Sequence, residues 1–341
     1  MENIFIIAEI GCNHNGDFSI AEKMVYKAKE IGVDAVKFQI FDASALISKY
    51  AEKADYQKKT TGSFESQLEM TKKLELGHAE YLELKKIAEN EGLIVFATPF
   101  DLSSIDFLSD NNQKIWKIPS GELTNLPYLE KINKLEIEDK KIILSTGMAT
   151  IDEINKCLDI LKDCKDITIM HCNTEYPTPD EDVNLYAINQ LKELFPKFKI
   201  GLSDHSVGSV AAIGAAALGI SVVEKHFTLD KNMDGPDHKA SATPSELKEI
   251  CEGIRRIEKM RGDYTKKVTD SERKNKKIAR KSIVAKRKIK SGDLFTYDNI
   301  TCKRPGNGIS PMEWYNVLGR EAEKDFNEDE LITISDIDNQ E

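Results

Sequence analysis

The stretch VVEKHF, residues 222–227, joins a buried-strand pattern to charged side chains. Its two valines are typical of a strand buried on both faces, because buried parallel strands have near-continuous apolar runs. Side chains alternate along a strand, so Glu224 and His226 share one face and Lys225 takes the other, where we expect a salt bridge. One such strand could simply end at the surface. The pattern becomes informative because it recurs along the chain.

Seven further β-type runs precede this one, and helix-type segments alternate with them. We predict strands at 4–10, 35–41, 93–98, 115–119, 141–145, 167–172, 199–204 and 222–227. Helical patterns include 20–31, 78–90, 150–162, 207–218 and 243–260. Such alternation over roughly 250 residues predicts a parallel sheet closed into a TIM (β/α)8 barrel. A doubly wound open sheet is the alternative, but it usually carries G-x-G-x-x-G after its first strand, and EIGCNHNGD at 9–17 does not match.

The composition changes after residue 262. The segment 266–281 is dense in charge and nearly free of large apolar residues, which predicts a solvated helix or linker. Residues 282–341 contain short β-like pieces broken by Gly, Pro and Asn, as in a small turn-rich β module. The predicted organisation is therefore a barrel at 1–265, a linker at 266–281 and a C-terminal module at 282–341.

Composition limits the partners of this 341-residue chain. The formal net charge of −10 argues against nonspecific binding of nucleic acid or anionic membranes. Six cysteines lie scattered without C-x-x-C spacing, so neither a disulfide framework nor a zinc ribbon is indicated. No apolar run is long enough to span a bilayer and no export signal is visible, so we expect a cytoplasmic protein.

Polar side chains end every predicted strand, where TIM-barrel enzymes place their active sites. In chain order they are Glu9, Lys37, Gln39, Thr98, Lys117, Ser120, Ser145, His171, Thr174, Tyr176, Ser203, Asp204, His205, Glu224 and His226. Each alone could be an ordinary transition to the surface. Their recurrence at all eight strand ends predicts one shared site.

Two lysines and three hydroxyls of this set, Lys37, Lys117, Thr98, Ser120 and Ser145, are typical of a cradle for a dianionic phosphate. They combine point charges with directional donors, which suits phosphate oxygens.

His205 and His226 could be hydrogen-bonded core residues, but on adjacent strands they can also meet as two imidazole ligands of a divalent metal. Two protein ligands leave coordination positions to water and substrate, which suits Lewis-acid chemistry. Glu9 and Glu224 are candidates for proton transfer.

Ten motifs, in this order, resemble those of the bacterial sialic acid synthase family. They are AEIGCNHNG (8–16), VKFQ (36–39), TPFD (98–101), KIPSGE (117–122), ILSTGM (143–148), HCNTEYPTP (171–179), GLSDHS (201–206), EKHFTLD (224–230), GPDHKAS (235–241) and KRPGNGISP (303–311). The resemblance runs essentially from end to end. It is strongest to N-acetylneuraminate synthases, with legionaminate synthases as near relatives.

The resemblance implies condensation of phosphoenolpyruvate with N-acetylmannosamine, giving N-acetylneuraminate and phosphate. It also implies a C-terminal antifreeze-like (SAF) domain that reaches into the barrel of a partner subunit in a domain-swapped homodimer. By motif, the metal ligands fall on His205 and His226, with manganese expected first and magnesium or cobalt as alternatives.

The resemblance assigns the remaining site residues by motif as well. Phosphoenolpyruvate contacts fall on Lys37, Thr98, Lys117, Ser120 and Ser145. Sugar and acid/base residues fall on Glu9, Gln39, Tyr176, Glu224 and Asp237, and the swapped domain contributes Arg304. Thr174 stands where an Asn can contribute to phosphate binding in some relatives, and its hydroxyl has a shorter reach.

Other functions remain open at this point. Within the family, a legionaminate-type synthase is the alternative. A Schiff-base aldolase would use Lys37 or Lys117 as nucleophile and would need no metal. A non-catalytic protein would carry a sugar- or ice-binding module on an inert barrel, and the strand-end lysines and histidines argue against it.

Overall fold

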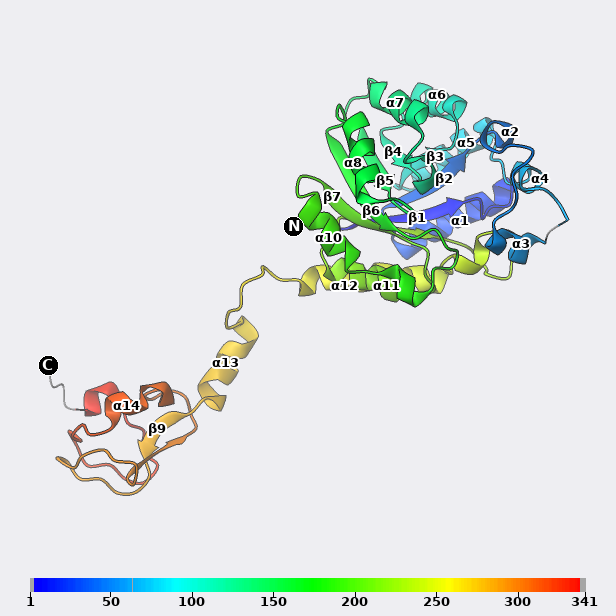
Figure 1. Cartoon of the computed structure of the whole chain (residues 1–341). Helices are drawn as coiled ribbons and strands as arrows, with labels where there is room; N and C mark the ends of the chain where they lie inside the picture. The colour runs from blue at the N-terminus through cyan, green and yellow to red at the C-terminus, as the bar shows by residue number, and fades with distance from the viewer. Residues whose placement is uncertain (1–2, 63, 338–341) are drawn as a thin grey trace. The chain divides into compact units, whose positions relative to one another are not determined.

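Within the residues that this computed structural model describes, 3–62 and 64–337, eight parallel strands form a nearly closed barrel (Figure 1). The hydrogen-bonded order is β3-β2-β1-β8-β7-β6-β5-β4, and β3 and β4 lie next to each other at the seam. The strands are β1 (Phe5–Gly11), β2 (Ala35–Ile40), β3 (Ile94–Pro99), β4 (Ile115–Ile118), β5 (Lys141–Ser145), β6 (Asp166–Cys172), β7 (Lys199–Asp204) and β8 (Val222–His226). The predicted TIM barrel is confirmed, and each predicted strand end lies within one residue of the observed one.

Helices cover the outside of the barrel (Figure 1). They are α1 (Phe18–Ile31), α5 (His78–Asn90), α6 (Leu102–Asp110), α7 (Leu126–Lys134), α8 (Ile151–Ile160), α10 (Ala187–Leu194), α11 (Val210–Ala217) and α12 (Pro244–Met260). Four short helices lie in connections instead: α2 (Ala43–Leu46), α3 (Asp55–Thr61) and α4 (Gln67–Lys72) between β2 and α5, and α9 (Asp180–Val183) after β6. The long α12 begins with a capping box: Thr243 accepts from the Glu246 N–H, and the Glu246 carboxylate accepts from the Thr243 N–H. No helix among the described residues is long and apolar enough to cross a membrane.

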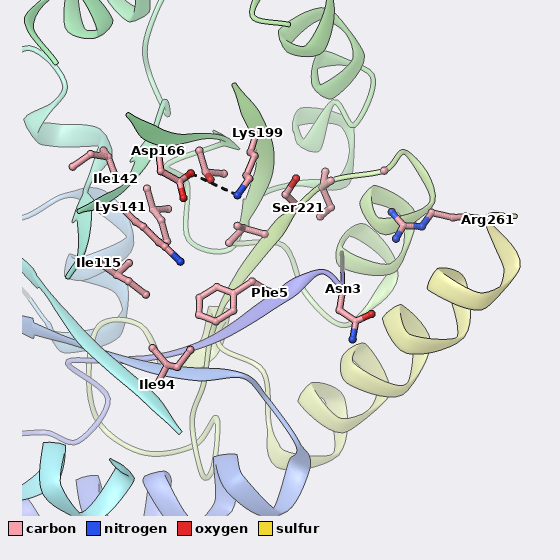
Figure 2. A pocket seen from close by; sticks show the side chains of 15 residues that line it. Asn3, Phe5, Ile94, Ile115, Lys141, Ile142, Asp166, Lys199, Ser221 and Arg261 are labelled. Atoms are coloured by element: carbon pink, nitrogen blue, oxygen red, sulfur yellow. Dashed lines mark ion pairs between the residues drawn. The ribbon is translucent and has the colours of Figure 1, made fainter. Parts of the chain in front are cut away.

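Side chains that point into the barrel form three layers, because every second residue of a strand faces inward. In β1 these are Phe5 at the amino-terminal mouth, Ile7 in the middle and Glu9 at the carboxyl-terminal mouth. Figure 2 shows Phe5 and Lys141 pointing into the amino-terminal mouth. The middle layer is apolar and consists of Ile7, Ala35, Phe96, Ile143, Met170 and Val222. It separates the two mouths of the barrel.

Gly201 in β7 leaves the space that Met170 fills in this middle layer. A Cβ atom at position 201 would lie 2.3 Å from the Met170 sulfur and 2.7 Å from the Val222 carbonyl oxygen. Both distances are far below van der Waals contact. The interior packing therefore requires glycine here.

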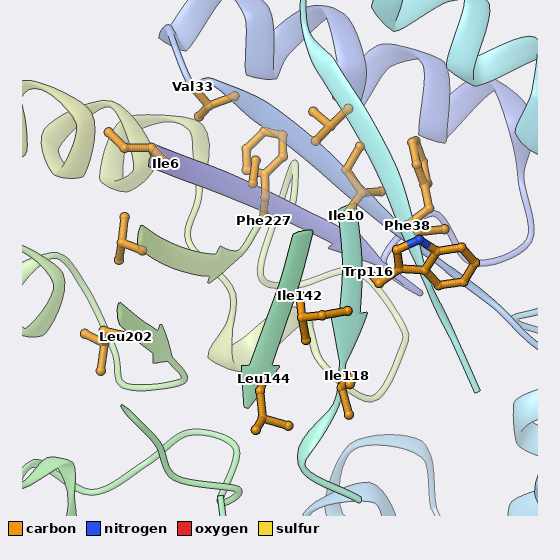
Figure 3. Packing of buried hydrophobic residues seen from close by; sticks show 14 of the residues in the cluster. Ile6, Ile10, Val33, Phe38, Trp116, Ile118, Ile142, Leu144, Leu202 and Phe227 are labelled. Carbon is orange, nitrogen blue, oxygen red and sulfur yellow. The ribbon is translucent and has the colours of Figure 1, made fainter. Parts of the chain in front are cut away.

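Side chains that point out of the barrel pack against the helices in one large apolar layer (Figure 3). Ile6, Leu144, Leu202 and Phe227 are buried there. The ring of Phe38 meets Tyr81 of α5 edge-on, with centroids 6.0 Å apart. This layer fixes the helices to the strands and so fixes the strand ends that carry the polar residues.

The chain divides into two compact units, Met1–Gly262 and Asp263–Glu341. The second contains α13 (Asp270–Ala279), the antiparallel pair β9 (Ser282–Ala285) and β10 (Ile300–Lys303), and α14 (Trp314–Val317). The charged segment forms α13, which has no buried residue. The turn-rich remainder has its own core, made of Ile283, Ala285, Ile289, Phe295, Ile300, Ile309, Val317, Ala322, Phe326 and Ile332.

Replacing Gly201 by alanine should lower the free energy of unfolding by about 1–3 kcal/mol, because the new methyl group overpacks the middle layer against Met170. Urea unfolding followed by circular dichroism measures the change. The matched control is Gly121→Ala, because a Cβ there meets nothing within 4 Å. We expect the control to stay within about 0.5 kcal/mol of the wild type. Equal stability of Gly201→Ala and the wild type would contradict the packing described here.

Candidate active site

Two adjoining cavities open at the carboxyl-terminal mouth of the barrel, a smaller one of about 180 Å³ and a larger one of about 460 Å³. The sequence-predicted residues that line the smaller cavity are Glu9, Lys37, Gln39, Thr98, Lys117, Ser120, Ser145, Thr174, Tyr176, Ser203, His205, Glu224 and His226. Asp237 lines the larger cavity, which shares Gln39, Tyr176 and His226 with the smaller one. The strand ends therefore bring these residues together around one space.

Lys37 lies in a buried ion pair with Glu9, with 2.7 Å between its Nζ and the carboxylate Oε2. Its ammonium also donates to the Thr98 hydroxyl at 2.8 Å. The other Glu9 oxygen accepts from the Gln39 amide at 2.9 Å. Burial raises the pKa of Glu9, and the nearby charge of Glu224 raises it further, against the opposing effect of Lys37.

A second buried ion pair joins Lys117 to Glu224 across the barrel, at 2.6 Å. Lys37 lies 3.8 Å from the same Glu224 oxygen, so this carboxylate faces two ammonium groups. Burial alone would raise the pKa of Glu224, but the two lysines outweigh it and hold the pKa below its ordinary value. The two glutamates therefore have pKa values shifted in opposite directions.

The hydroxyl groups are presented differently. Ser120 accepts from the Gly147 N–H at 3.0 Å. The Ser145 oxygen is buried and has no hydrogen-bond partner among the described residues. Thr174 turns its methyl group toward Gly147, where an added Cβ would lie 2.6 Å from it. Ser145 is thus the hydroxyl that most clearly lacks a partner, as expected of a group that waits for a ligand.

The imidazoles of His205 and His226 lie with their ring centroids 5.4 Å apart. His205 Nδ1 lies 2.5 Å from the Asn173 carbonyl oxygen, so in the neutral ring this nitrogen carries the proton and Nε2 has the lone pair. The Tyr176 hydroxyl lies 3.1 Å from that Nε2, and the Tyr176 ring stacks on His205 with centroids 4.1 Å apart.

His226 lines the same space and has a ring nitrogen without a partner among the described residues. Its Nδ1 is buried and has no hydrogen-bond partner in the part of the chain that the structure describes. Burial lowers the pKa of His226 well below its ordinary value, and the neighbouring His205 and lysines lower it further. A neutral ring with an unused lone pair is what a metal ligand needs.

Cys172 is a site residue that the sequence analysis did not single out. Its sulfur lies 3.8 Å from His205 Nδ1 and 3.7 Å from the Ser120 oxygen. Burial alone would raise the pKa of Cys172, but His205 and Lys117 lower it below its ordinary value. Burial would lower the pKa of His205, and Cys172 raises it above its ordinary value. Alternation along β6 could have found this residue, since Met170 also faces inward.

The wall of the larger cavity comes partly from the long connection between β2 and α5, which holds α2, α3 and α4. Tyr56 of α3 stacks on Tyr176, with ring centroids 5.3 Å apart. The sequence analysis did not predict this contact. Its one signal was the length of the connection, since long loops in compact domains are usually functional.

Asp237 accepts a hydrogen bond from the Cys12 thiol, with 3.3 Å between sulfur and oxygen. Burial raises the pKa of Asp237. The predicted sugar contact is thus buried beside Tyr176 and His226 in the larger cavity.

Two strand-end residues predicted to share the site face away from it. His171 Nε2 meets the Val183 carbonyl oxygen at 2.8 Å. Asp204 pairs with Lys225 at 2.8 Å, and this confirms the salt bridge expected for Lys225. Both sit at outward positions of the strand alternation, so the prediction was wrong for His171 and Asp204. Arg304 belongs to the second unit, where its side chain is exposed after β10.

The chain is similar to known proteins over nearly its whole length. Residues 24–266 match the NeuB family and residues 280–338 match the SAF domain. The chain is 52% identical over 338 residues to an N,N'-diacetyllegionaminic acid synthase of Campylobacter jejuni, covering 97% of this chain and 99% of that protein. It is 36% identical over 343 residues to human N-acetylneuraminate-9-phosphate synthase, covering 98% and 93%.

Among solved structures, the chain resembles an N-acetylneuraminic acid synthetase from Leptospira borgpetersenii. The TM-score is 0.70 and the sequences are 32% identical. The match covers 80% of this chain and 90% of that one.

The variants Glu9→Gln and Glu224→Gln should change the pH dependence of stability in opposite directions. Because the pKa of folded Glu9 is raised, its contribution is full below the ordinary value of 4.5 and is lost as pH rises through the folded pKa. Glu9→Gln should therefore gain stability relative to the wild type as pH rises.

For Glu224 the pKa is lowered, so its contribution is present above 4.5 and is lost as pH falls through the folded pKa. Glu224→Gln should therefore lose stability relative to the wild type as pH rises. Free energies of unfolding in urea, measured from acid pH to neutrality, give both slopes. Slopes of the same sign would contradict the pKa directions.

Proposed function

The chain belongs to the NeuB family, and we propose that it condenses phosphoenolpyruvate with an N-acetylated amino sugar, giving a nonulosonic acid and phosphate. The observation that carries this proposal is the buried layer of two lysines and two glutamates at the carboxyl-terminal mouth of the barrel. Such a layer can bind a highly charged small substrate and move protons beside it.

Phosphoenolpyruvate brings a phosphate and a carboxylate, and we assign its binding to Lys37, Lys117, Thr98, Ser120 and Ser145. Each ammonium has three donors, so each lysine can keep its glutamate and still donate to a substrate oxygen. The unpartnered Ser145 hydroxyl supports this assignment. Thr174, which turns its methyl group to Gly147, would add a weaker contact.

The opposite pKa shifts of the two glutamates suggest how they divide the work, because carboxyl pairs with separated pKa values are typical of acid/base sites. The methylene carbon of phosphoenolpyruvate, an enol phosphate, attacks the sugar aldehyde. The aldehyde oxygen takes up a proton and becomes a hydroxyl group, and positive charge develops at the carbon adjacent to the attacking one. Glu9 stabilises that charge and takes the proton of the water that adds there. Loss of phosphate from the resulting intermediate leaves the 2-keto acid.

Glu224 stays ionised in this scheme and holds Lys117 in place. Tyr176 donates its hydroxyl hydrogen to a sugar oxygen. Gln39, which lines both cavities, and Asp237, which lines the larger one, also bind the sugar.

His205 and His226 fit a divalent metal, because His226 Nδ1 is unpartnered and His205 Nε2 keeps its lone pair. No group of three or more His, Cys, Asp or Glu side chains is arranged to hold an ion among residues 3–62 and 64–337. Two imidazoles would therefore leave most positions to water and substrate, with manganese expected first and magnesium or cobalt as alternatives. The bound ion would supply Lewis-acid polarisation of the sugar aldehyde.

The identity of the sugar is a finer question. The motifs favour N-acetylmannosamine, whereas the relative at 52% identity is an N,N'-diacetyllegionaminic acid synthase. The larger cavity has a mainly apolar wall, made of Phe41, Leu46, Ile47, Ala51, Met70 and Leu74, with the amides of Gln57 and Gln67 among them.

A second acetamido group would place its methyl on such a wall and its amide beside a glutamine. We therefore rank a diacetamido six-carbon sugar, and a legionaminate-type product, ahead of N-acetylmannosamine and N-acetylneuraminate.

A Schiff-base aldolase is less well supported by the geometry. Its lysine must be a neutral amine in order to attack a carbonyl. Lys37 and Lys117 each lie within 2.7 Å of a carboxylate oxygen, and such pairs favour the charged ammonium.

The Arg304 assignment concerns assembly. We propose a domain-swapped homodimer in which the SAF domain of one subunit presents Arg304 to the sugar bound in the barrel of the other. The exposed position of Arg304, and a core within the second unit that does not include it, are compatible with this role.

The sugar assignment predicts the product. Incubation with phosphoenolpyruvate and each of several N-acetylated sugars should give the highest kcat/KM with a diacetamido hexose, and mass spectrometry identifies the acid formed. N-acetylmannosamine should react less efficiently, because it leaves the apolar wall uncovered. A preference for N-acetylmannosamine would instead assign the chain as an N-acetylneuraminate synthase.

Chelation should abolish turnover, and manganese, magnesium or cobalt should restore it, because two imidazoles make an open and unselective site. His205→Ala and His226→Ala should each weaken binding of Mn²⁺ by about tenfold or more, which electron paramagnetic resonance measures directly. His78→Ala is the matched control, because His78 lies outside both cavities. Full activity of a metal-free preparation would rule out the metal.

Co-expression of Arg304→Ala chains with His226→Ala chains should restore activity that neither variant has alone. If Arg304 acts across the dimer, each hybrid has one intact site. About half of randomly mixed dimers are hybrids, so roughly a quarter of the sites should work. No recovery in purified hybrids would place Arg304 on its own barrel or outside the site.

A further inference from the structure

A cavity of about 430 Å³ lies at the amino-terminal mouth of the barrel, at the other end from the proposed active site (Figure 2). The first residues of seven strands line it: Phe5, Ile94, Ile115, Lys141, Asp166, Lys199 and Val222. It shares no lining residue with the cavities at the carboxyl-terminal mouth. This end of a TIM barrel ordinarily contributes to stability, so its side chains should satisfy one another.

One half of the cavity wall is apolar. Phe5, Ile94 and Ile115 come from β1, β3 and β4, and Figure 2 shows the Phe5 ring and both isoleucines facing the shared space. Ile94 keeps 46% of its surface exposed, so this part of the apolar wall is accessible from solvent. An apolar surface is therefore left open to a ligand.

The other half carries more positive than negative charge. Lys141 and Lys199 begin β5 and β7, and Arg261 follows α12 at the rim. Asp166 is the one carboxylate among the residues that line the cavity, and it lies 3.6 Å from Lys199. Three cations thus face a single carboxylate, in a protein whose formal net charge is −10.

Two of these cations lack a protein counter-charge. No carboxylate lies within ion-pair distance of Lys141 or Arg261 among the described residues, and the Arg261 Nε is buried without a hydrogen-bond partner. Burial lowers the pKa of nearby Lys192, and the positive charge of Arg261 lowers it further. The excess of positive charge is therefore not neutralised by the protein around it.

We propose that this amino-terminal mouth is a second binding site, for a small carboxylate that carries an apolar or aromatic body. The carboxylate would lie between Lys141 and Lys199, the apolar body would cover Phe5 and Ile94, and Arg261 would add positive charge at the rim. The cavity volume lies within the range of small-molecule sites, which is roughly 300–1,000 Å³.

The site is independent of the proposed condensation. The apolar middle layer, with Ile7, Ile143 and Met170, lies between the two mouths. A ligand at the amino-terminal mouth would touch Phe5, whereas Glu9 of the same strand faces the carboxyl-terminal mouth. Saturation of the carboxyl-terminal site with phosphoenolpyruvate should therefore leave the amino-terminal site free.

Phenylacetate is a suitable probe, because it joins a carboxylate to an aromatic ring. In isothermal titration calorimetry with saturating phosphoenolpyruvate, we expect millimolar or tighter binding to the full chain, weakening as salt is added. Phenylacetamide has the same shape without the charge, and inorganic phosphate has charge without the ring. Both should bind at least about tenfold more weakly.

The variant Lys141→Gln/Lys199→Gln should weaken phenylacetate binding by about tenfold or more, since it removes two charge-assisted contacts. Both lysines are exposed, so the variant should fold. The control Lys86→Gln/Lys156→Gln removes the same charge from α5 and α8 and should bind as the wild type does.

Three results would overturn the proposal. They are no binding of phenylacetate in the millimolar range, equal binding of phenylacetamide, or unchanged binding by Lys141→Gln/Lys199→Gln. Loss of phenylacetate binding on addition of phosphoenolpyruvate would also overturn it, because that result would place the probe in the site at the carboxyl-terminal mouth.

Discussion

Four buried charges, on Lys37, Lys117, Glu9 and Glu224, constrain everything at the carboxyl-terminal mouth of the barrel. An isolated ion in a protein interior costs several kcal/mol, and only close opposite charges and hydrogen bonds offset that cost. The pairs Lys37–Glu9 and Lys117–Glu224 meet this condition. These four charges thus sum to zero, although each group remains strongly polar. The affinity for phosphoenolpyruvate would therefore be a difference, between the contacts that the lysines make to substrate and those they already make to glutamate.

The strand alternation links this charged layer to the rest of the fold. In β1 it places Glu9 above Ile7, and in β7 the absence of a side chain at Gly201 lets Met170 fill the middle of the barrel. The middle layer keeps water from reaching the charged layer through the amino-terminal mouth. Ion pairs and hydrogen bonds are stronger where water is excluded. The same alternation leaves a second set of strand-end residues, including Lys141, at the opposite mouth. One barrel interior thus provides two chemically different cavities.

The strands and most of the site at the carboxyl-terminal mouth could be predicted from the sequence, because buried strands and polar strand ends are local patterns. Glu224 and Lys225 were assigned to opposite faces, and the structure agrees. Polarity at a strand end does not by itself place a residue in the site: His171 lies at an outward position of the alternation and contacts the Val183 carbonyl oxygen. Tyr56 was missed because α3 has seven residues, too few for a clear apolar period. The pairing of lysines with glutamates could not be predicted, since it depends on distances across the closed barrel.

The central claim is that the charged layer binds phosphoenolpyruvate through ion pairs and hydrogen bonds, while Lys37 and Lys117 remain ammonium groups. Phosphorus NMR of the enzyme mixed with phosphoenolpyruvate and a diacetamido hexose tests it most directly, together with mass spectrometry of the protein after incubation with pyruvate and borohydride. We predict release of inorganic phosphate only when the sugar is present, and no covalent adduct on either lysine. A reduced pyruvate adduct on Lys37 or Lys117 would contradict the account and would identify a Schiff-base aldolase.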